Sequence, residues 1–228
     1  MADSRRDKRF TLTLTTDYQQ DQWGLSEAMR EVMANAMDAE ARGDGRMVLQ
    51  HLPRTDTLKV TTQGVVLDRS VLLMGSSTSR GRDECIGTFG EGLPMAILTL
   101  ARLSRDHEDF SFEIDNGQER WRAAIEHSEK WGADVCTIST RKRRQAVPDA
   151  FTVTVRGIDA DSYRSLRDRF LSLDPGFDEA ETCKPRAYKY DRVLLQPEFR
   201  GCIYVRGVYV KSRPDLRYGY DLSMKLNR

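Results

Sequence analysis

The sequence lacks the features that mark membrane or secreted proteins. No run of about eighteen apolar residues occurs, and the charged N-terminus MADSRRDKRF has no apolar region after it. The 4 cysteines lie far apart without a C-x-x-C pair, which favours reduced, mostly buried thiols over a disulfide framework or a zinc site. We therefore expect a soluble, cytoplasmic protein without a membrane span or a signal peptide.

Excess charge of one sign is also absent. Charged residues make up 31% of the chain, yet the formal net charge is +1, so no global field argues for nucleic acid or a membrane as partner. The basic run from Arg141 to Arg144 could bind phosphate or nucleic acid, but such a run is more often a solvated hairpin tip. Nucleic-acid binding is therefore ranked last as a primary function.

Hydrophobic periodicity predicts alternating strands and helices, with a hairpin turn at Asn116-Gly117. Strands are expected at 10–16, 47–51, 57–62, 110–114, 119–126, 135–140, 151–156, 192–195, 202–205 and 208–211. Helices are expected at 23–41, 69–74, 94–103 and from Asp159 or Asp161 to Leu173. No internal repeat or low-complexity linker is visible, so the sequence predicts a single α/β domain over 1–228, with a mixed sheet covered by helices.

The helical segment 25–39 carries three polar side chains on one face. Residues three and four apart share a helix face, so Glu31, Asn35 and Asp38 form one polar line. The segment is otherwise rich in methionine, valine and alanine, and a carboxylate near buried surface is costly unless it is paired, hydrogen-bonded or bound to a metal. The alternative is that Glu31 and Asp38 only mark the solvated edge of an amphipathic helix.

A glycine-rich run opens the next long helix. Gly87, Gly90 and Gly92 precede the apolar, helix-patterned residues 94–103. Glycines at this spacing let backbone N–H groups approach an anion closely, and a helix N-terminus adds roughly half a positive charge. The pattern predicts a phosphate-binding turn, although glycines also mark plain turns. A polar helix followed by a glycine-rich turn that opens a second helix is a rarer combination than either feature alone.

These two motifs resemble those of the GHKL, or Bergerat-fold, ATPases, which include gyrase B subunits, heat-shock chaperones, MutL mismatch-repair proteins, MORC proteins and histidine-kinase ATP domains. Glu31-x-x-x-Asn35-x-x-Asp38-Ala39 looks like the first motif of that family, and 87–92 looks like its later glycine motif. The segment 73–79 is similar to the ATP lid of the chaperone-like and MORC-like members, a branch that includes phage rIIA-type proteins. The resemblance implies an α+β two-layer sandwich, with helices packed on one face of the mixed sheet.

The resemblance also implies roles for single residues. Glu31 would direct the water that attacks the terminal phosphate, and Asn35 would offer a neutral oxygen to a magnesium ion (Mg2+) that bridges phosphates. Asp38 would line the nucleotide cleft. The residues expected to contact ATP from the lid and the glycine turn are Ser76, Ser77, Thr78, Ser79, Gly87, Thr88, Phe89, Gly90, Glu91, Gly92 and Leu93. Arg80 and Arg82 could pair with phosphate oxygens when the lid closes.

Two motifs depart from the family pattern. The family's second motif is Asp-x-Gly-x-Gly, whose aspartate accepts from the adenine amino group. Here Thr62 stands in place of that aspartate, Gly64 matches the first glycine, and Val66 replaces the second. Charge-assisted hydrogen bonds are roughly twice as strong as neutral ones, so adenine selectivity is the least secure expectation. The fourth motif is blurred, and Thr152 and Thr154 are the nearest candidates for its threonine.

The resulting hypothesis is an ATP-binding domain with slow, magnesium-dependent hydrolysis, in which a nucleotide-responsive lid is coupled to homodimerisation or to a protein partner. The alternative is a catalytically degenerate module that kept the fold and binds another nucleotide, or only a protein partner. Nothing in the chain resembles the transducer domain that supplies a lysine to the terminal phosphate in this family. The sequence leaves open whether the chain is an N-terminal fragment of a longer protein or a stand-alone domain.

Overall fold

The computed structural model describes residues 8–18, 23–72, 91–143, 147–183 and 191–222. The chain divides into two compact units, Met1–Tyr163 and Arg164–Arg228, where the sequence predicted one domain. Each unit is described by itself below.

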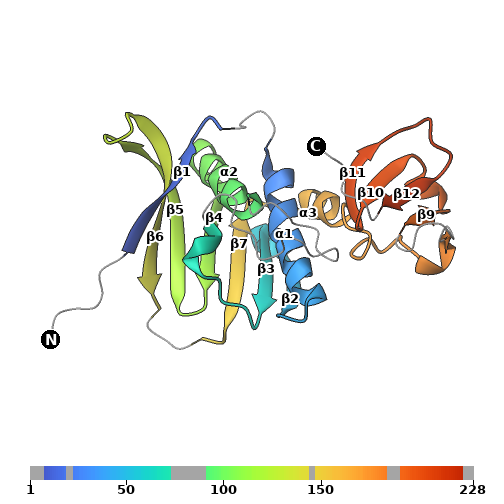
Figure 1. Ribbon diagram of the computed structural model, residues 1–228, viewed down its shortest axis with the longest axis horizontal. Helices are drawn as coiled ribbons and strands as arrows, with labels where there is room; N and C mark the ends of the chain where they lie inside the picture. Colours follow the sequence, from blue (N-terminus) through green and yellow to red (C-terminus); the bar gives the residue numbers. More distant parts are fainter. Residues whose placement is uncertain (1–7, 19–22, 73–90, 144–146, 184–190, 223–228) are drawn as a thin grey trace. The chain divides into compact units, whose positions relative to one another are not determined.

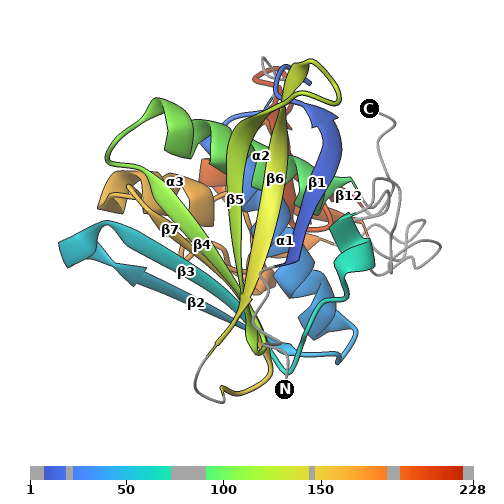
Figure 2. The same ribbon diagram turned by 90° about the vertical axis from the view of Figure 1, so that its left-hand side faces the viewer.

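The first unit is built on a seven-stranded sheet with the strand order β1-β6-β5-β4-β7-β3-β2 (Figures 1 and 2). Its strands are β1 (Lys8–Thr15), β2 (Arg46–Leu52), β3 (Thr57–Gln63), β4 (Ser111–Asn116), β5 (Glu119–Ser128), β6 (Ala133–Lys142) and β7 (Ala150–Arg156). Every neighbouring pair in this order is antiparallel, whereas the sequence predicted a mixed sheet. The predicted positions of these strands are confirmed to within two residues at each end.

Two helices pack on one face of this sheet (Figure 2). α1 (Leu25–Ala41) contacts β2 and β3, α2 (Gly92–Asp106) contacts β4 and β5, and the two helices contact each other. A short 3-10 helix, η3 (Arg69–Leu72), stands where the sequence predicted a helix over 69–74, and it contacts α2. The α+β arrangement of a sheet packed against helices is therefore confirmed.

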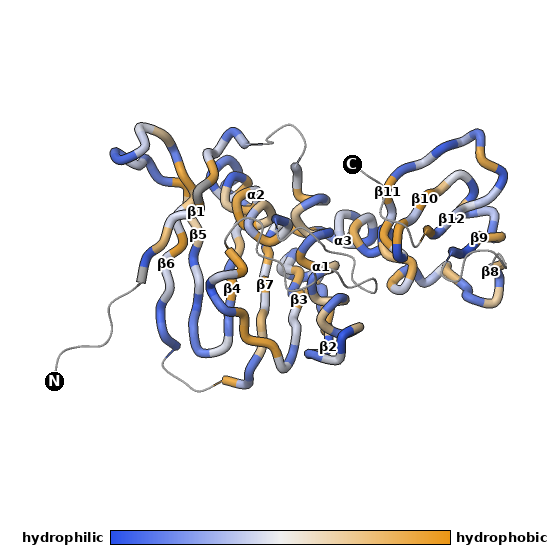
Figure 3. The backbone as a smooth tube through the Cα atoms, in the orientation of Figure 1, coloured by the Kyte–Doolittle hydropathy of each residue, from blue (hydrophilic) through white to orange (hydrophobic). Residues whose placement is uncertain are grey.

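The core of the first unit lies between the sheet and these helices. Strand alternation places apolar side chains on the helix-covered face, and the tube coloured by hydropathy shows orange and blue alternating along the strands (Figure 3). The register aligns one row of buried residues across five strands: Val60, Val153, Ile114, Trp121 and Thr140. Every residue of α2 from Leu93 to Arg102 is buried, which a helix tolerates only when it is surrounded by protein.

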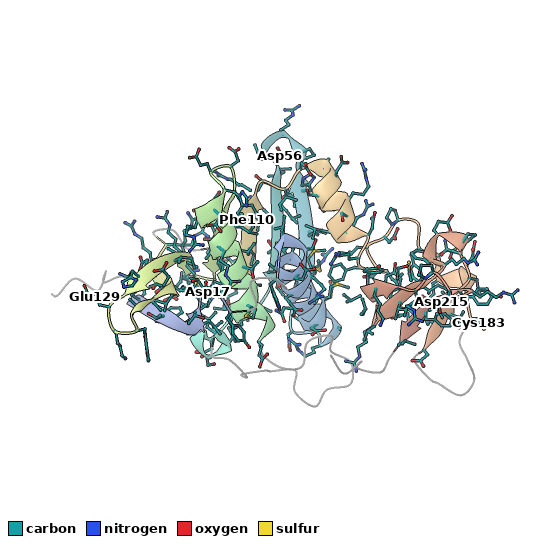
Figure 4. All side chains as sticks on the ribbon, turned by 90° about the horizontal axis from the view of Figure 1, so that it is seen from above. Asp17, Asp56, Phe110, Glu129, Cys183 and Asp215 are labelled. Atoms are coloured by element: carbon teal, nitrogen blue, oxygen red, sulfur yellow. The ribbon has the colours of Figure 1, made fainter. Side chains whose placement is uncertain are left out.

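Local contacts explain where two of these elements begin and turn. The backbone N–H of Gly24 donates to Oε2 of Glu27 (3.1 Å), which satisfies a donor before the first turn of α1. Between β2 and β3, η2 (Pro53–Thr55) is followed by Asp56 in the left-handed region at φ 44 (Figure 4). The carbonyl of Asp56 accepts from the N–H of Ile158 (2.8 Å), so this turn is fixed to the chain that leaves β7.

The second unit contains a five-stranded sheet with the order β11-β10-β12-β9-β8. Its elements are β8 (Thr182–Cys183), β9 (Arg192–Leu194), β10 (Cys202–Val205), β11 (Val208–Ser212), β12 (Gly219–Leu222), η4 (Glu179–Glu181) and η5 (Pro197–Phe199). Among the described strands, parallel pairing occurs only between β10 and β12. The core consists of Leu171, Leu194, Phe199 and Tyr204. α3 (Ala160–Arg167), which the sequence extended to Leu173, crosses the boundary between the units along the chain.

Candidate functional site

The carboxylate of Glu31 on α1 lies directly against Gly92, the first residue of α2. A Cβ atom on Gly92 would overlap Oε2 of Glu31 and lie 3.1 Å from its Cδ. Gly92 does not have a positive φ, so a glycine is needed here for space and not for backbone conformation. The packing of α1 on α2 thus brings together two residues from motifs that lie sixty residues apart in the sequence.

Glu31 also pairs with the residue before it. Nη2 of Arg30 donates to Oε1 of Glu31 at 2.9 Å, and both side chains are only 17% exposed. Asp38, two turns further along the same helix, is 3% exposed. These exposures exclude the alternative that Glu31 and Asp38 mark the solvated edge of α1.

Asn35 lies one turn after Glu31 and is exposed. Asp38, by contrast, is buried and has a polar interaction. The polar line predicted on α1 consists of a largely buried acid, an exposed amide and a buried acid.

Thr62 and Gly64 lie at the end of β3, on which α1 packs. Thr62 is 5% exposed and sits beside Phe151 on the helix-covered face of the sheet. Gly64 has φ 82, a conformation that favours glycine, and its N–H donates to the carbonyl of Asp149 (2.8 Å). Gly64 therefore turns the chain sharply out of β3.

The start of α2 holds the last predicted residues of the glycine turn. Glu91 is the exposed N-cap residue, and its carbonyl accepts from the N–H of Met95 (3.1 Å). Leu93 is buried in the core. The other predicted phosphate and lid residues lie outside the described residues; they are Ser76, Ser77, Thr78, Ser79, Gly87, Thr88, Phe89 and Gly90, together with Arg80 and Arg82.

Thr152 lies on the face of the sheet opposite to the one that carries Thr62. In the β3–β7 pairing it lies opposite Thr61, and the two hydroxyl oxygens are 3.1 Å apart. Phe151, its neighbour in β7, points to the helix-covered face next to Thr62, so Thr152 points to the other face. The same alternation places Thr154 on the face away from α1 and α2.

Asn116, at the end of β4, and Arg69, the first residue of η3, were not identified as functional candidates from the sequence. Asn116, which was interpreted only as a turn residue, is 3% exposed, and its side-chain amide binds both backbone groups of Leu67. Arg69 donates to Glu119 (2.7 Å) and Thr140 (3.1 Å). The signal for Asn116 was available, because a polar residue in a strand that alternates toward the core must find a partner.

The basic run begins within β6, at Arg141 and Lys142, and is partly neutralised through Arg143. Nη1 of Arg143 lies 2.8 Å from Oδ2 of Asp115, whereas Arg141 and Lys142 are exposed. Arg144 lies outside the described residues. β6 and β7 are not neighbours in the sheet, so the run does not lie at the tip of a hairpin between them.

In the described ranges, no three His, Cys, Asp or Glu side chains converge as a metal-binding group. None of the described helices has the length and apolar character needed to cross a membrane.

No protein-family model matches the chain, and no curated protein matches it. Among solved structures, the ATPase region of topoisomerase II from Saccharomyces cerevisiae aligns at 14% identity with a TM-score of 0.46, over 81% of this chain and 62% of that one. The same region bound to ICRF-187 aligns at 13% identity with a TM-score of 0.45 and the same coverages. The ATPase and transducer domains of DNA topoisomerase II from Balamuthia mandrillaris align at 13% identity with a TM-score of 0.43, over 89% of this chain and 66% of that one. The chain thus spans less than two thirds of each of these structures.

Proposed function

We propose that the first unit binds ATP with Mg2+ and hydrolyses it slowly, as a domain of the GHKL type. The observation that supports this proposal is the contact between the Glu31 carboxylate and Gly92 at the N-terminus of α2. A helix N-terminus presents unpaired N–H groups and partial positive charge, which suit a phosphate chain. Glu31 stands next to that position, where a water attacking the terminal phosphorus needs an acceptor.

The role proposed for Glu31 is to orient this water and accept its proton. Phosphoryl transfer depends mainly on positioning and on neutralising charge, and a positioned base contributes typically about 10²–10⁴-fold to the rate. The ion pair with Arg30 fixes the direction of the Glu31 carboxylate, because one of its two oxygens is already engaged at 2.9 Å. The other oxygen faces Gly92.

The donor set fits a magnesium ion. The Glu31 carboxylate lies where a Cβ atom on Gly92 would be, and the exposed Asn35 would offer a neutral oxygen one turn along the same helix. Mg2+ commonly uses one or two protein oxygens together with water and substrate phosphates. Bound there, the ion would supply positive charge to a triphosphate that otherwise faces the carboxylate of Glu31, so nucleotide binding should depend on Mg2+.

We further propose that Thr62 lies at the adenine end of the site and that Asp38 lines the cleft between the two ends. The lid is assigned to Ser76, Ser77, Thr78 and Ser79, and the phosphate turn to 87–92. Lid closure would be coupled to homodimerisation or to a protein partner, in a cytoplasmic protein of the chaperone-like or MORC-like branch. The motif resemblance supports these assignments.

A second candidate function is a module that kept the fold but lost catalysis. The replacement of the family's adenine-binding aspartate by Thr62 favours it, because a neutral hydroxyl makes a weaker contact with the base. Isothermal titration with ATP, ADP and GTP in the presence of Mg2+ separates the two candidates. Binding of ATP supports the nucleotide site, and silence for all three nucleotides supports a protein-interaction module.

Hydrolysis is tested with Glu31→Gln, which keeps the volume of the side chain and removes its charge. We expect ATP affinity within about threefold of wild type and a phosphate-release rate lower by about 10²–10⁴-fold. Glu40→Ala is the matched control, because Glu40 is an exposed acid on the same helix. Equal turnover by Glu31→Gln and wild type would remove Glu31 from its proposed role.

A further inference from the structure

The chain that follows β3 runs across one end of the first sheet. We call residues 64–72 the crossing segment (Figure 2). It is bonded in turn to the start of β7, to β4, and to β5 and β6. The bonds are Gly64 N–H to the Asp149 carbonyl, the Leu67 backbone to the Asn116 amide, and the Arg69 guanidinium to Glu119 and Thr140.

Asn116 makes the central attachment. Its Oδ1 accepts from the N–H of Leu67 at 2.8 Å, and its Nδ2 donates to the carbonyl of Leu67 at 2.8 Å. One side chain thus imitates the paired bonds of a neighbouring strand. Asn116 is 3% exposed, so water cannot replace these bonds readily.

The adjacent glycine makes room for the crossing segment. Gly117 has φ 55, and a Cβ atom there would lie 2.9 Å from Cγ2 of Val66. Val66 is the residue that replaces the second glycine of the family motif. Its side chain packs on Gly117, so the substitution in the motif and the glycine of the hairpin fit each other.

The register places Asn116 near the proposed adenine end of the site. Thr62 is opposite Phe151, and Phe151 is opposite Asn116, so the three residues form one cross-strand row. All three are buried on the helix-covered face. With strands spaced about 4.8 Å apart, Thr62 and Asn116 are separated by about 10 Å, the width of one intervening strand.

We propose that Asn116 is a positioning residue for base recognition. It acts by fixing the backbone from Gly64 to Leu67 beside Thr62. This inference rests on the proposed nucleotide site and adds the residue that holds its adenine end in shape. Asn116 acts through the crossing segment and does not itself touch the nucleotide. The phosphate end, at Glu31 and Gly92, lies on other elements and is independent of it.

The test compares two ligands on the full chain with Mg2+: ATP and inorganic tripolyphosphate, which has the same phosphates without the base. We expect Asn116→Ala to raise the Kd for ATP by about tenfold and the Kd for tripolyphosphate by less than about twofold. Hydrogen exchange of the Leu67 amide should become faster in the free protein. Gln118→Ala is the matched control, because Gln118 is in the same hairpin and its side-chain amide donates to the Val147 carbonyl and not to the crossing segment.

The outcomes separate the two proposals. A similar loss of affinity for both ligands, or unchanged ATP affinity with faster Leu67 exchange, overturns the positioning role while leaving the nucleotide site intact. Failure of the wild-type protein to bind ATP overturns the proposed function and this inference with it. If Asn116→Ala does not fold, Asn116→Asp takes its place under the same criteria, since it keeps the acceptor for the Leu67 N–H and loses the donor.

Discussion

Replacing Gly92 by alanine tests the contact on which the proposed site depends. The new Cβ would overlap Oε2 of Glu31 and lie 3.1 Å and 3.4 Å from Cδ and Cγ. The backbone of α2 is held in place because every residue from Leu93 to Arg102 is buried. The Glu31 carboxylate must therefore move instead, by roughly 1 Å, and a displacement of that size can reduce a rate about 100-fold. We therefore expect phosphate release to fall by about two orders of magnitude.

Gly92→Ala should also lower the free energy of unfolding by a modest amount, because two opposing contributions partly balance. Overpacking costs typically about 1–3 kcal/mol, and alanine recovers up to about 1 kcal/mol of helix propensity. The free energy of unfolding, measured with urea, should thus fall by about 0–3 kcal/mol. In the Glu31→Ala background the overlap disappears, so the same substitution should be neutral or stabilising, and the double-mutant cycle isolates the contact.

Gly24→Ala is the control for this experiment, because Gly24 begins the other long helix and a Cβ there meets only Oε2 of Glu27 at an ordinary 3.5 Å. We expect it to lower stability by about 1 kcal/mol as a lost N-cap glycine and to leave hydrolysis unchanged. The reasoning is refuted if Gly92→Ala retains full turnover and has the same stability cost with and without the Glu31 carboxylate.

Three other perturbations give distinct results. Asp221→Asn should destabilise the second unit by about 3–5 kcal/mol, seen as faster proteolysis of 164–228, because the buried carboxylate accepts from Arg192 at 3.0 Å and from a backbone N–H. Burial raises the pKa of the Cys136 thiol to about 12, so at pH 8 iodoacetamide should modify the exposed Cys183 and spare Cys136. The folded protein keeps the Cys136 proton that the unfolded chain releases near pH 9. Between pH 9 and 11 the free energy of unfolding should therefore fall with pH more steeply than in Cys136→Ala, by about 1.4 kcal/mol per pH unit. Equal slopes for the two proteins would contradict this. Thr62→Asp should increase the preference for ATP over GTP by about tenfold, measured by titration, if Thr62 faces adenine.

The positions of strands and helices followed well from the sequence because the pattern has a local cause. Alternation in 151–156 and 57–62 gave β7 and β3, and Asn116-Gly117 gave the hairpin between β4 and β5. The strand order did not follow, because alternation records which face of a strand is buried and not which strand lies beside it. The sheet was therefore expected to be mixed, whereas its pairs are antiparallel in the first unit. β12, which begins at Gly219, was missed because its four residues are too short to show a period.

In the candidate site, too, the residues with a local sequence signal were predicted and those that depend on distant partners were not. Glu31, Asn35 and Asp38 could be found from helical spacing, and Gly92 from the glycine pattern, since both are local signals. Thr152 was selected because it lies close in sequence to a blurred motif. The alternation along β7 places its side chain on the face of the sheet away from α1 and α2.

Arg30 and Asn116 were missed for a common reason: each acts through a partner that the sequence does not identify. An arginine beside a glutamate on a helix normally points elsewhere, because neighbours in sequence diverge by about 100° around the axis. Here the long Arg30 side chain turns back to the Glu31 carboxylate, and both become largely buried. Asn116 looks like a turn residue until the chain from β3 is seen to cross above it.

Arg30 and Asn116 would also act on opposite ends of the proposed site. Arg30 fixes the acid that would face the phosphates, and Asn116 fixes the backbone that would face the base. In the proposed site, the neutral hydroxyl of Thr62 would make a weaker contact with the base than a carboxylate, so the shape of the loop would contribute more of the discrimination between bases. A base preference that survives Thr62→Val but disappears in Asn116→Ala would show that recognition has moved from a side-chain charge to the rigidly held backbone.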